Sequence, residues 1–269
     1  MDLNNVKLVV SDMDGTLLND KGEVSTRFFE LFKKLQRQNI LFCAASGRQY
    51  DSIIDKLATI KDDIYVIAEN GGIAKKADKV LLLKALNTKK VINVVPVLRN
   101  IKDANIVLCS QDTAFIESND VDFISYFQEY YHSYSIVDDL IEVAKITSIL
   151  KIAVHHASSS EDFIYPEIKH LKEDYLLKIS GQNWLDISDD KANKGNALRE
   201  VQKLLNISKE ETMVFGDYLN DIEMLQEATF SFAMANAHND ITKIANYATR
   251  SNNNFGVESV LEKLIRANS

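Results

Sequence analysis

Residues 9–18 read Val-Val-Ser-Asp-Met-Asp-Gly-Thr-Leu-Leu, an apolar run that ends in two aspartates. The run predicts a buried strand over residues 6–11, after which Gly15 and Thr16 turn the chain away. Such a strand delivers the carboxylates of Asp12 and Asp14 into one crevice at its C-terminal end. Two like charges side by side do not help folding, so the pair indicates a chemical role.

A solvated turn and a calcium-binding loop are the simpler interpretations of this Asp-x-Asp pair. A calcium loop of the EF-hand type needs acidic or amide ligands at positions 1, 3 and 5, and glycine at position 6. Counted from Asp12, position 5 is Thr16 and position 6 is Leu17, so the calcium-loop interpretation fails. A solvated turn and a metal-binding strand end both remain, and the rest of the chain must decide between them.

Length and composition describe an ordinary globular protein. The 269 residues predict about two domains, and 46% hydrophobic residues are enough for a proper core. The net charge of −8 argues against a nucleic-acid partner, which needs Lys and Arg clustered on one face. No apolar run approaches the roughly 20 residues of a membrane span, and residues 1–5 show no secretory signal. We therefore expect a cytoplasmic protein without a membrane partner.

Strand and helix patterns alternate in the first 82 residues and resume in the last 80. Short apolar runs between amphipathic helices are typical of a parallel sheet that is covered on both faces. We therefore expect the α/β class, with a doubly wound parallel-sheet (Rossmann-like) core. The expected strands are 6–11, 40–45, 64–68, 213–215 and 230–233, and the expected helices are 25–38, 53–57, 197–205 and 222–225.

The pattern changes between residues 84 and 188. Neighbouring strand-like segments within 106–116 and within 175–187 indicate hairpins, which the crossovers of a parallel sheet do not allow. Helices are expected near 122–131 and 162–172, whereas Pro96 leaves an earlier helix undecided. We expect residues 84–188 to be an inserted α+β domain, with residues 1–83 and 189–269 forming the core.

The insert and its junction give few functional signals. Tyr126, Tyr130 and Tyr131 are expected on one packed helix rather than on a stacking platform. The pair His155-His156 is expected at the surface or at a sheet edge. The stretch Asn70-Gly71-Gly72 fits a substrate contact and an ordinary strand-end turn equally well.

Four polar clusters follow expected strands or open expected helices. They are Asp12/Asp14, Ser46-Gly47, Lys194-Gly195 and Gly216-Asp217-Tyr218-Leu219-Asn220-Asp221. Ligands of an open parallel sheet bind outside the carboxyl ends of its strands. Each cluster alone is typical of a turn or a helix cap, but capping does not explain all four in this order. The clusters together predict one site at that edge of the sheet.

The order Asp-Met-Asp-Gly-Thr, Ser-Gly-Arg, Lys-Gly and Gly-Asp-x-x-Asn-Asp resembles the haloacid dehalogenase (HAD) superfamily of phosphatases. The large insert between the second and third motifs is similar to the Cof-type branch, which hydrolyses sugar phosphates and other small phosphoesters. The resemblance includes the stretch Phe232-Ala233-Met234-Ala235-Asn236-Ala237. It implies a phosphoric monoester hydrolase whose insert is a cap that closes over the site and sets substrate specificity.

The resemblance also implies roles for the clustered residues. Asp12 is expected to attack phosphorus and form an aspartyl-phosphate, with Asp14 as general acid and then general base. The implied cofactor is Mg²⁺, a hard cation with oxygen ligands. The expected metal ligands are Asp12, Asp14 (through its backbone carbonyl), Asp217 and Asp221, the last directly or through water. The expected phosphate-binding residues are Met13, Ser46, Gly47, Lys194 and Asn220.

Two other functions use similar residues. A receiver-type phosphoacceptor domain is much shorter than this chain and would carry neither a second catalytic aspartate nor a large insert. A sugar phosphomutase shares the fold and the aspartyl-phosphate, but no residue here requires its bisphosphate activator. We therefore favour a phosphatase whose partner is a small phosphorylated metabolite, as a monomer or weak homodimer. The sequence does not identify that metabolite.

Overall fold

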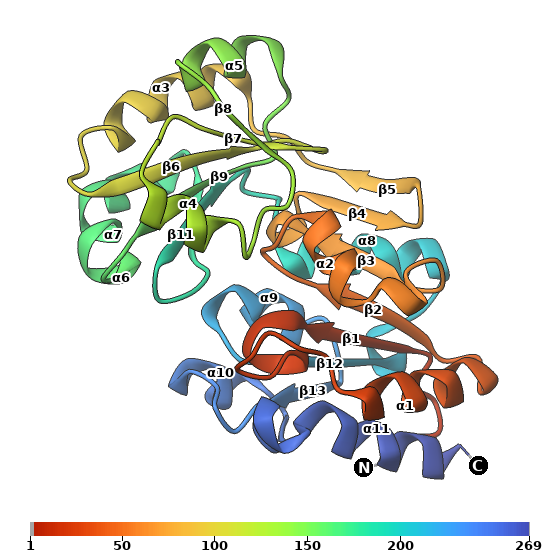
Figure 1. The fold of residues 1–269 in the computed structure, drawn as a ribbon. Coiled ribbons are helices and arrows are strands. Elements are labelled where there is room, and N and C mark those ends of the chain that lie inside the picture. The colour runs from red at the N-terminus through yellow and green to blue at the C-terminus, as the bar shows by residue number, and fades with distance from the viewer. Residues whose placement is uncertain (1–2, 269) are drawn as a thin grey trace.

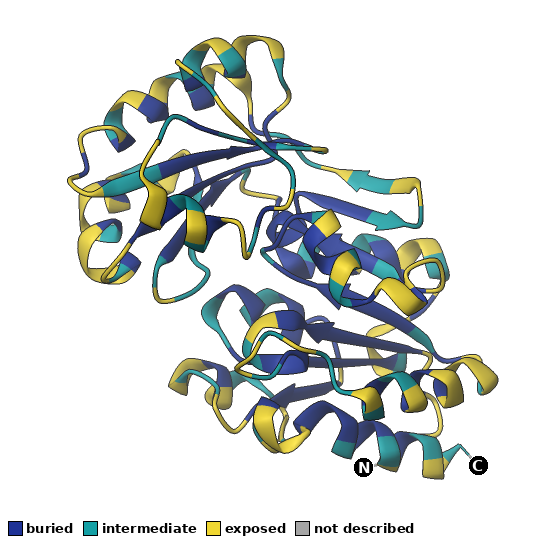
Figure 2. Ribbon diagram, in the orientation of Figure 1, coloured by how far each residue is buried: buried dark blue, intermediate teal, exposed yellow. Residues whose placement is uncertain are grey.

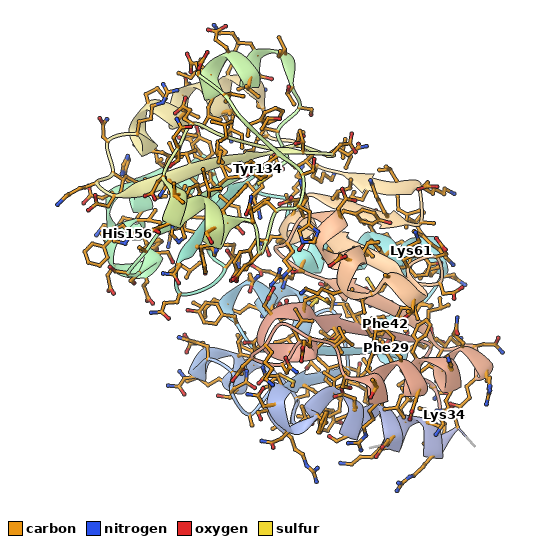
Figure 3. The ribbon with its side chains drawn as sticks, in the orientation of Figure 1. Phe29, Lys34, Phe42, Lys61, Tyr134 and His156 are labelled. Carbon is orange, nitrogen blue, oxygen red and sulfur yellow. The ribbon has the colours of Figure 1, made fainter. Side chains whose placement is uncertain are left out.

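Two β-sheets with their helices form the two halves of the computed structural model, which describes residues 3–268 (Figure 1). The inner strands of both sheets are buried, whereas edge strands such as β5 (Lys79–Leu83) and many residues on helices and in turns are partly or fully exposed (Figure 2). Side chains fill the space between the ribbons, with Phe42 in the half of the larger sheet and Tyr134 in the half of the smaller one (Figure 3).

Eight strands of the described chain form the larger sheet, in the order β14-β13-β12-β1-β2-β3-β4-β5. The central strand β1 pairs in parallel with both β2 and β12, so the C-terminal ends of these three strands lie together. The edge formed by β3, β4 and β5 is antiparallel. The bounds are β1 Leu8–Asp12, β2 Leu41–Ala45, β3 Tyr65–Ala68, β4 Ile73–Lys76, β5 Lys79–Leu83, β12 Thr212–Gly216, β13 Phe230–Ala233 and β14 Tyr247–Ala248.

Helices cover both faces of this sheet because successive side chains of a strand point to opposite faces. Val9 of β1 packs in the cluster that contains α1 and α11, whereas Leu8 and Val10 pack in the cluster that contains α8. The expected α/β class and doubly wound core are confirmed. The helices are α1 Thr26–Arg37, α2 Tyr50–Lys56, α8 Lys194–Leu205, α9 Ile222–Leu225, α10 Asn239–Ile244 and α11 Gly256–Ala267.

The hairpin of β4 and β5 was not expected from the sequence. Lys76 pairs with Lys79, so the connecting turn has only two residues, Ala77 and Asp78. Such turns normally select Asn-Gly or Asp-Gly, because they need residues at positive φ. Here Ala77 adopts φ 47°, a conformation that its side chain does not favour. The residues of this turn therefore do not identify it as a hairpin turn in the sequence.

Six strands within residues 3–268 form the smaller sheet, in the order β10-β11-β9-β6-β7-β8. The expected hairpins are confirmed, since β6 pairs with β7 and β10 with β11 in antiparallel register. The strands are β6 Ala104–Cys109, β7 Ala114–Ile116, β8 Tyr134–Ile136, β9 Lys151–His156, β10 Leu176–Ile179 and β11 Trp184–Ser188. The helices are α3 Thr88–Leu98, α4 Val121–Phe127, α5 Leu140–Ile146, α6 Ser160–Phe163 and α7 Tyr165–Ile168.

Two expectations for the insert are wrong, and one open question is answered. Helix α4 ends at Phe127, so Tyr130 and Tyr131 lie in the turn that follows it and not on the same helix. His155 and His156 are buried because β9 lies between β11 and β6, in the interior of the sheet. Helix α3 does form, and Pro96 lies in its last turn.

The two sheets divide the chain near the expected domain boundaries. Strand β5 of the larger sheet ends at Leu83, and β11 of the smaller sheet ends at Ser188. The assignment of residues 84–188 to a separate domain stays a prediction. None of the helices in the described residues combines the length and apolar character that crossing a membrane requires.

Burial of His155 makes a prediction about stability. Phe123, Tyr126 and Trp184 surround its ring, and burial lowers the pKa of His155 from 6.5 to about 4. His155 therefore becomes protonated near pH 6.5 in the unfolded chain but only near pH 4 in the folded chain. As a result, the free energy of unfolding falls as the pH drops from 6.5 towards 4.

We expect His155→Phe to reduce the loss of Tm between pH 7 and pH 5 by about 2–4 °C relative to wild type, measured by thermal unfolding. The exposed His170 provides the control, because His170→Gln should retain the wild-type pH dependence. An identical pH dependence in His155→Phe and wild type would show that His155 is not the group that titrates.

Candidate active site

Strand β1 and the turn that follows it place two carboxylates at the C-terminal edge of the larger sheet. The turn η1 spans Met13–Leu17. Asp12 is 5% exposed at the end of β1, whereas the side chain of Asp14 is 46% exposed. The crevice predicted from residues 9–18 is therefore present, with one carboxylate deep in it and one near solvent.

The turn η1 packs directly against the loop after β12. Thr16 Oγ1 donates a hydrogen bond to Asp217 Oδ1 at 2.9 Å. Gly15 has φ 75°, and a Cβ atom at this position would lie 2.3 Å from Asp217 Oδ2. Because only glycine leaves room for that carboxylate, the Gly-Thr pair of the motif fixes the position of Asp217.

Three of the predicted metal ligands come together. One carboxylate oxygen each from Asp12, Asp217 and Asp221 lies within 4.8 Å of the others. They meet because β1 and β12 are neighbours, and Asp217 and Asp221 follow β12, Asp221 at the end of the short helix η6 (Leu219–Asp221). A compact set of carboxylate oxygens fits a hard divalent cation such as Mg²⁺.

Lys194 joins this cluster from the first residue of α8. Its Nζ donates to Asp12 Oδ1 at 2.6 Å and to Asp221 Oδ1 at 2.7 Å, and its side chain is fully buried. Burial alone lowers the pKa of Lys194, but the two carboxylates raise it above its ordinary value. The lysine therefore stays charged, and one positive charge faces three buried carboxylates.

Burial and the excess of negative charge raise the pKa values of two of these carboxylates. Burial raises the pKa of Asp12 well above its ordinary value; Lys194 opposes this rise, whereas Asp221, Asp217 and Asp14 add to it. Burial, followed by the charge of Asp221, raises the pKa of Asp217 to about 7. The single positive charge of Lys194 does not balance three buried carboxylates, so the donor set fits a cation that would offset the remaining negative charge.

Asp221 differs from the other two carboxylates because both of its oxygens accept hydrogen bonds, whereas Lys194 and Thr16 donate to Oδ1 of Asp12 and of Asp217. Oδ1 accepts from Lys194, and Oδ2 accepts from the backbone amides of Asp217 at 3.0 Å and Tyr218 at 3.2 Å. These bonds hold the loop after β12 in place. Asp12 and Asp217 are therefore better placed than Asp221 to ligate a metal directly.

Arg48 belongs to the site although the sequence analysis gave it no role. It follows Ser46-Gly47, and its backbone amide donates to Ser46 Oγ at 3.1 Å. Its guanidinium holds both oxygens of Asp14, with Nε to Oδ2 at 2.8 Å and one terminal nitrogen to Oδ1 at 2.6 Å. The motif Ser-Gly-Arg contains Arg48, but nothing in the sequence indicates that it pairs with Asp14, 34 residues earlier in the chain.

Residues of the smaller sheet complete the site, and the sequence analysis missed them. Lys151 Nζ of β9 lies 2.9 Å from Glu69 Oε2 and 3.4 Å from Asp186 Oδ1 of β11. Asn70 Nδ2 donates to the other oxygen of Asp186, and Asn70 Oδ1 accepts from Asn220 Nδ2 at 2.9 Å. Asn70 thus links the smaller sheet to the fourth sequence motif, which is more than an ordinary turn requires.

A pocket lies between the two sheets. The predicted residues Asp12, Asp14, Ser46, Gly47, Asp217 and Asn220 line it, while Lys194 and Asp221 are buried beside Asp12. Its other lining residues are Arg48, Tyr130, Tyr131, Lys151, Ser180, Trp184, Asp186 and Tyr218. The four sequence motifs therefore meet in one pocket that both sheets enclose.

The family model of the haloacid dehalogenase-like hydrolases matches residues 9–261. The chain belongs to this family. It is 32% identical to the 5-amino-6-(5-phospho-D-ribitylamino)uracil phosphatase YbjI of Escherichia coli (strain K12), over 97% of both chains. The resemblance inferred from the motifs and the expectation of an enzyme are confirmed.

Solved structures share the whole fold. SMU.1108c from Streptococcus mutans UA159 has a TM-score of 0.89 at 25% identity and covers 97% of this chain and 99% of its own. The HAD subclass IIB sugar phosphatase BT4131 has a TM-score of 0.83 at 20% identity, over 96% and 98% of the two chains. The overall fold of two sheets is therefore shared with these two solved structures.

The contact between Gly15 and Asp217 can be tested by substitution. Gly15→Ala combines a positive φ with a steric clash against a carboxylate. Gly22→Ala is the matched control, because Gly22 has φ 69° and a Cβ there would meet only the flexible end of Lys56 at 3.9 Å.

We expect Gly22→Ala to lower the free energy of unfolding by about 1–2 kcal/mol through backbone strain alone. Gly15→Ala should lower it by a further 1–3 kcal/mol or so, as overpacking does. Urea denaturation of both variants measures the difference. Equal losses would mean that the site tolerates a side chain at residue 15.

Proposed function

We propose that this chain, a phosphatase of the HAD-like hydrolase family, hydrolyses small phosphate monoesters such as sugar phosphates in a Mg²⁺-dependent reaction. The observation that carries the proposal is the cluster of Asp12, Asp217 and Asp221 around Lys194, with Asp14 beside it in the same pocket. The relative YbjI is named for a small phosphorylated metabolite, which supports the same substrate class.

The first proposed step is attack by the carboxylate of Asp12 on phosphorus. A bond forms between this oxygen and phosphorus while the bond to the leaving oxygen breaks, which gives an aspartyl-phosphate. Lys194 orients Asp12 through the 2.6 Å hydrogen bond and offers positive charge to the transferring group. Water then attacks the aspartyl-phosphate, releases phosphate and regenerates Asp12.

Asp14 is the proposed general acid for the leaving oxygen and the general base for the water. Both of its oxygens accept from Arg48, and each oxygen keeps a second lone-pair site that can take the proton while Asp14 stays in contact with this guanidinium. Arg48 also donates to the carbonyl oxygen of Glu129, in the turn after α4. The orientation of Asp14 is therefore tied, through Arg48, to the turn after α4.

The remaining predicted residues would hold the phosphoryl group and the metal. Phosphoryl oxygens would accept from the Ser46 hydroxyl, from the amides of Gly47 and Met13, and from Asn220. Mg²⁺ would be held by the side chains of Asp12 and Asp217 and by the carbonyl of Asp14, with Asp221 acting through water. When bound, the cation would offset the charge of the phosphate and of the carboxylates around it.

The other predictions made from the sequence remain to be tested by experiment. We propose that residues 84–188 form the cap domain, because this segment supplies one side of the pocket. A receiver domain and a sugar phosphomutase remain less favoured, because the family match is to hydrolases and the relative YbjI is named as a phosphatase. A cytoplasmic location, the lack of a nucleic-acid partner and a monomer or weak homodimer also stay predictions.

Asp12→Asn tests the nucleophile. The variant keeps the shape of the side chain but cannot form an acyl phosphate, so kcat for p-nitrophenyl phosphate should fall at least about 10³-fold while the fold is retained. Steady-state kinetics and circular dichroism measure the two properties. The exposed Asp51 on α2 gives the control, since Asp51→Asn should keep wild-type kinetics. Substantial turnover by Asp12→Asn would show that another group attacks phosphorus.

Removal of divalent cations tests the metal. We expect EDTA to abolish phosphate release and added Mg²⁺ to restore it, because carboxylates without a cation repel a phosphate dianion. Asp217→Asn should raise the Mg²⁺ concentration for half-maximal activity by at least about tenfold, as loss of a ligand does. Asp240→Asn, at an exposed position on α10, should leave that concentration unchanged. Full activity in EDTA would refute the metal assignment.

A further inference from the structure

The side of the pocket formed by the smaller sheet contains a lysine whose ammonium group is already paired with the carboxylates of Glu69 and Asp186. Lys151 Nζ donates to the carbonyl oxygen of Gly47 at 2.7 Å. It also lies 2.9 Å from Glu69 Oε2 and 3.4 Å from Asp186 Oδ1. An ammonium group has three N–H donors, and three oxygens surround this one. The ammonium group of Lys151 is therefore already in contact with protein oxygens on every donor side.

Arg48, the other cation that lines the pocket, is occupied in the same way. It makes two hydrogen bonds to Asp14, one to Ser52 Oγ and one to the carbonyl oxygen of Glu129. These use four of the five N–H groups of a guanidinium. One face of the group lies over the ring of Tyr130, with 4.6 Å between Cζ and the ring centroid. Its position leaves little capacity for an additional anion.

The charge around Lys151 is not positive. Glu69 and Asp186 both pair with this lysine, and all three residues are at most 2% exposed. With both carboxylates ionised the group carries one net negative charge. If the two share a proton, the group is neutral. In neither case does it offer a positive field to a ligand.

The remaining groups on this side are neutral. Tyr130, Tyr131, Ser180 and Trp184 complete the wall that the smaller sheet and its turns contribute. Lys21 and Lys56 line a separate surface pocket that shares Asp14, Arg48 and Tyr130 with this one. A compact leaving group in the pocket between the sheets therefore meets hydroxyls, rings and paired charges.

We propose that this pocket selects phosphate monoesters whose leaving group carries no second anion. Neutral polyols and amine-bearing alcohols fit it, whereas a carboxylate or a second phosphate would lose its hydration, find no unpaired cation and face Glu69 and Asp186. The inference rests on the proposed phosphatase activity. It also distinguishes the chain from a phosphomutase, whose activator is a bisphosphate.

A series of six-carbon phosphates that differ in charge provides the test. The first set is glucosamine 6-phosphate, glucose 6-phosphate and 6-phosphogluconate, and the second set is fructose 6-phosphate and fructose 1,6-bisphosphate. For each, kcat/KM is measured, together with the constant for competitive inhibition of p-nitrophenyl phosphate hydrolysis. The inhibition constant reports binding even for a compound that is not turned over.

We expect kcat/KM to be at least about 30-fold lower for 6-phosphogluconate than for glucose 6-phosphate, and for fructose 1,6-bisphosphate than for fructose 6-phosphate. For glucosamine 6-phosphate, kcat/KM should equal or exceed that for glucose 6-phosphate. Asp186→Asn removes one negative charge from the group around Lys151. The variant should lower the ratio of kcat/KM between the neutral and the anionic compound by at least about fivefold, whatever its effect on overall activity. Asp138→Asn is the control, because Asp138 is exposed and lies outside the residues that line the pocket.

Three results would contradict the proposal in distinguishable ways. Equal kcat/KM and inhibition constants for 6-phosphogluconate and glucose 6-phosphate would overturn the selectivity and leave the phosphatase function intact. A ratio that is unchanged in folded Asp186→Asn would overturn it too, because the charge of Asp186 is part of its stated cause. A lack of phosphate release from every compound, including p-nitrophenyl phosphate with Mg²⁺, would overturn the proposed function itself. If Asp186→Asn does not fold, the wild-type ratios decide alone.

Discussion

The ammonium group of Lys194 is the interaction on which the site depends. It is fully buried, and it bonds Asp12 and Asp221, which lie more than 200 residues apart in the chain. Buried carboxylates without a partner are strongly destabilising, and one cation that bridges two of them satisfies both. The same contact brings β1, α8 and the loop after β12 to one point. The acidic cluster can therefore exist before any metal is bound.

The order of the strands makes this contact possible. Because β1 lies between β2 and β12 in parallel register, three of the four sequence motifs emerge at one edge of the sheet. Their loops then approach more closely than side chains would allow. A Cβ atom at Gly216 would lie 2.7 Å from Asp221 Oδ2, just as one at Gly15 would meet Asp217. The glycines are as necessary to the geometry as the carboxylates.

The sequence predicted the parts of the structure that local pattern determines. Apolar runs that end in polar turns identified the strands, and helical spacing identified α1 and α8, because one buried face leaves a periodic trace. The contacts of Lys151, Asp186 and Arg48 depend on how two distant segments meet, and a single charged residue leaves no such trace. The burial of His155 and His156 was missed for the same reason, since it follows from the interior position of β9 in its sheet. The catalytic and metal-binding roles of the clustered residues stay predictions.

The pairing of Lys151 across the two sheets limits how the protein can be recombined. The lysine belongs to β9 of the smaller sheet, whereas Gly47 and Glu69 follow β2 and β3 of the larger sheet. If residues 84–188 were replaced by the corresponding segment of a relative with an apolar residue at position 151, Glu69 would remain buried without its positively charged partner. An exchange of this segment between family members therefore requires that Glu69 and Lys151 are transferred together.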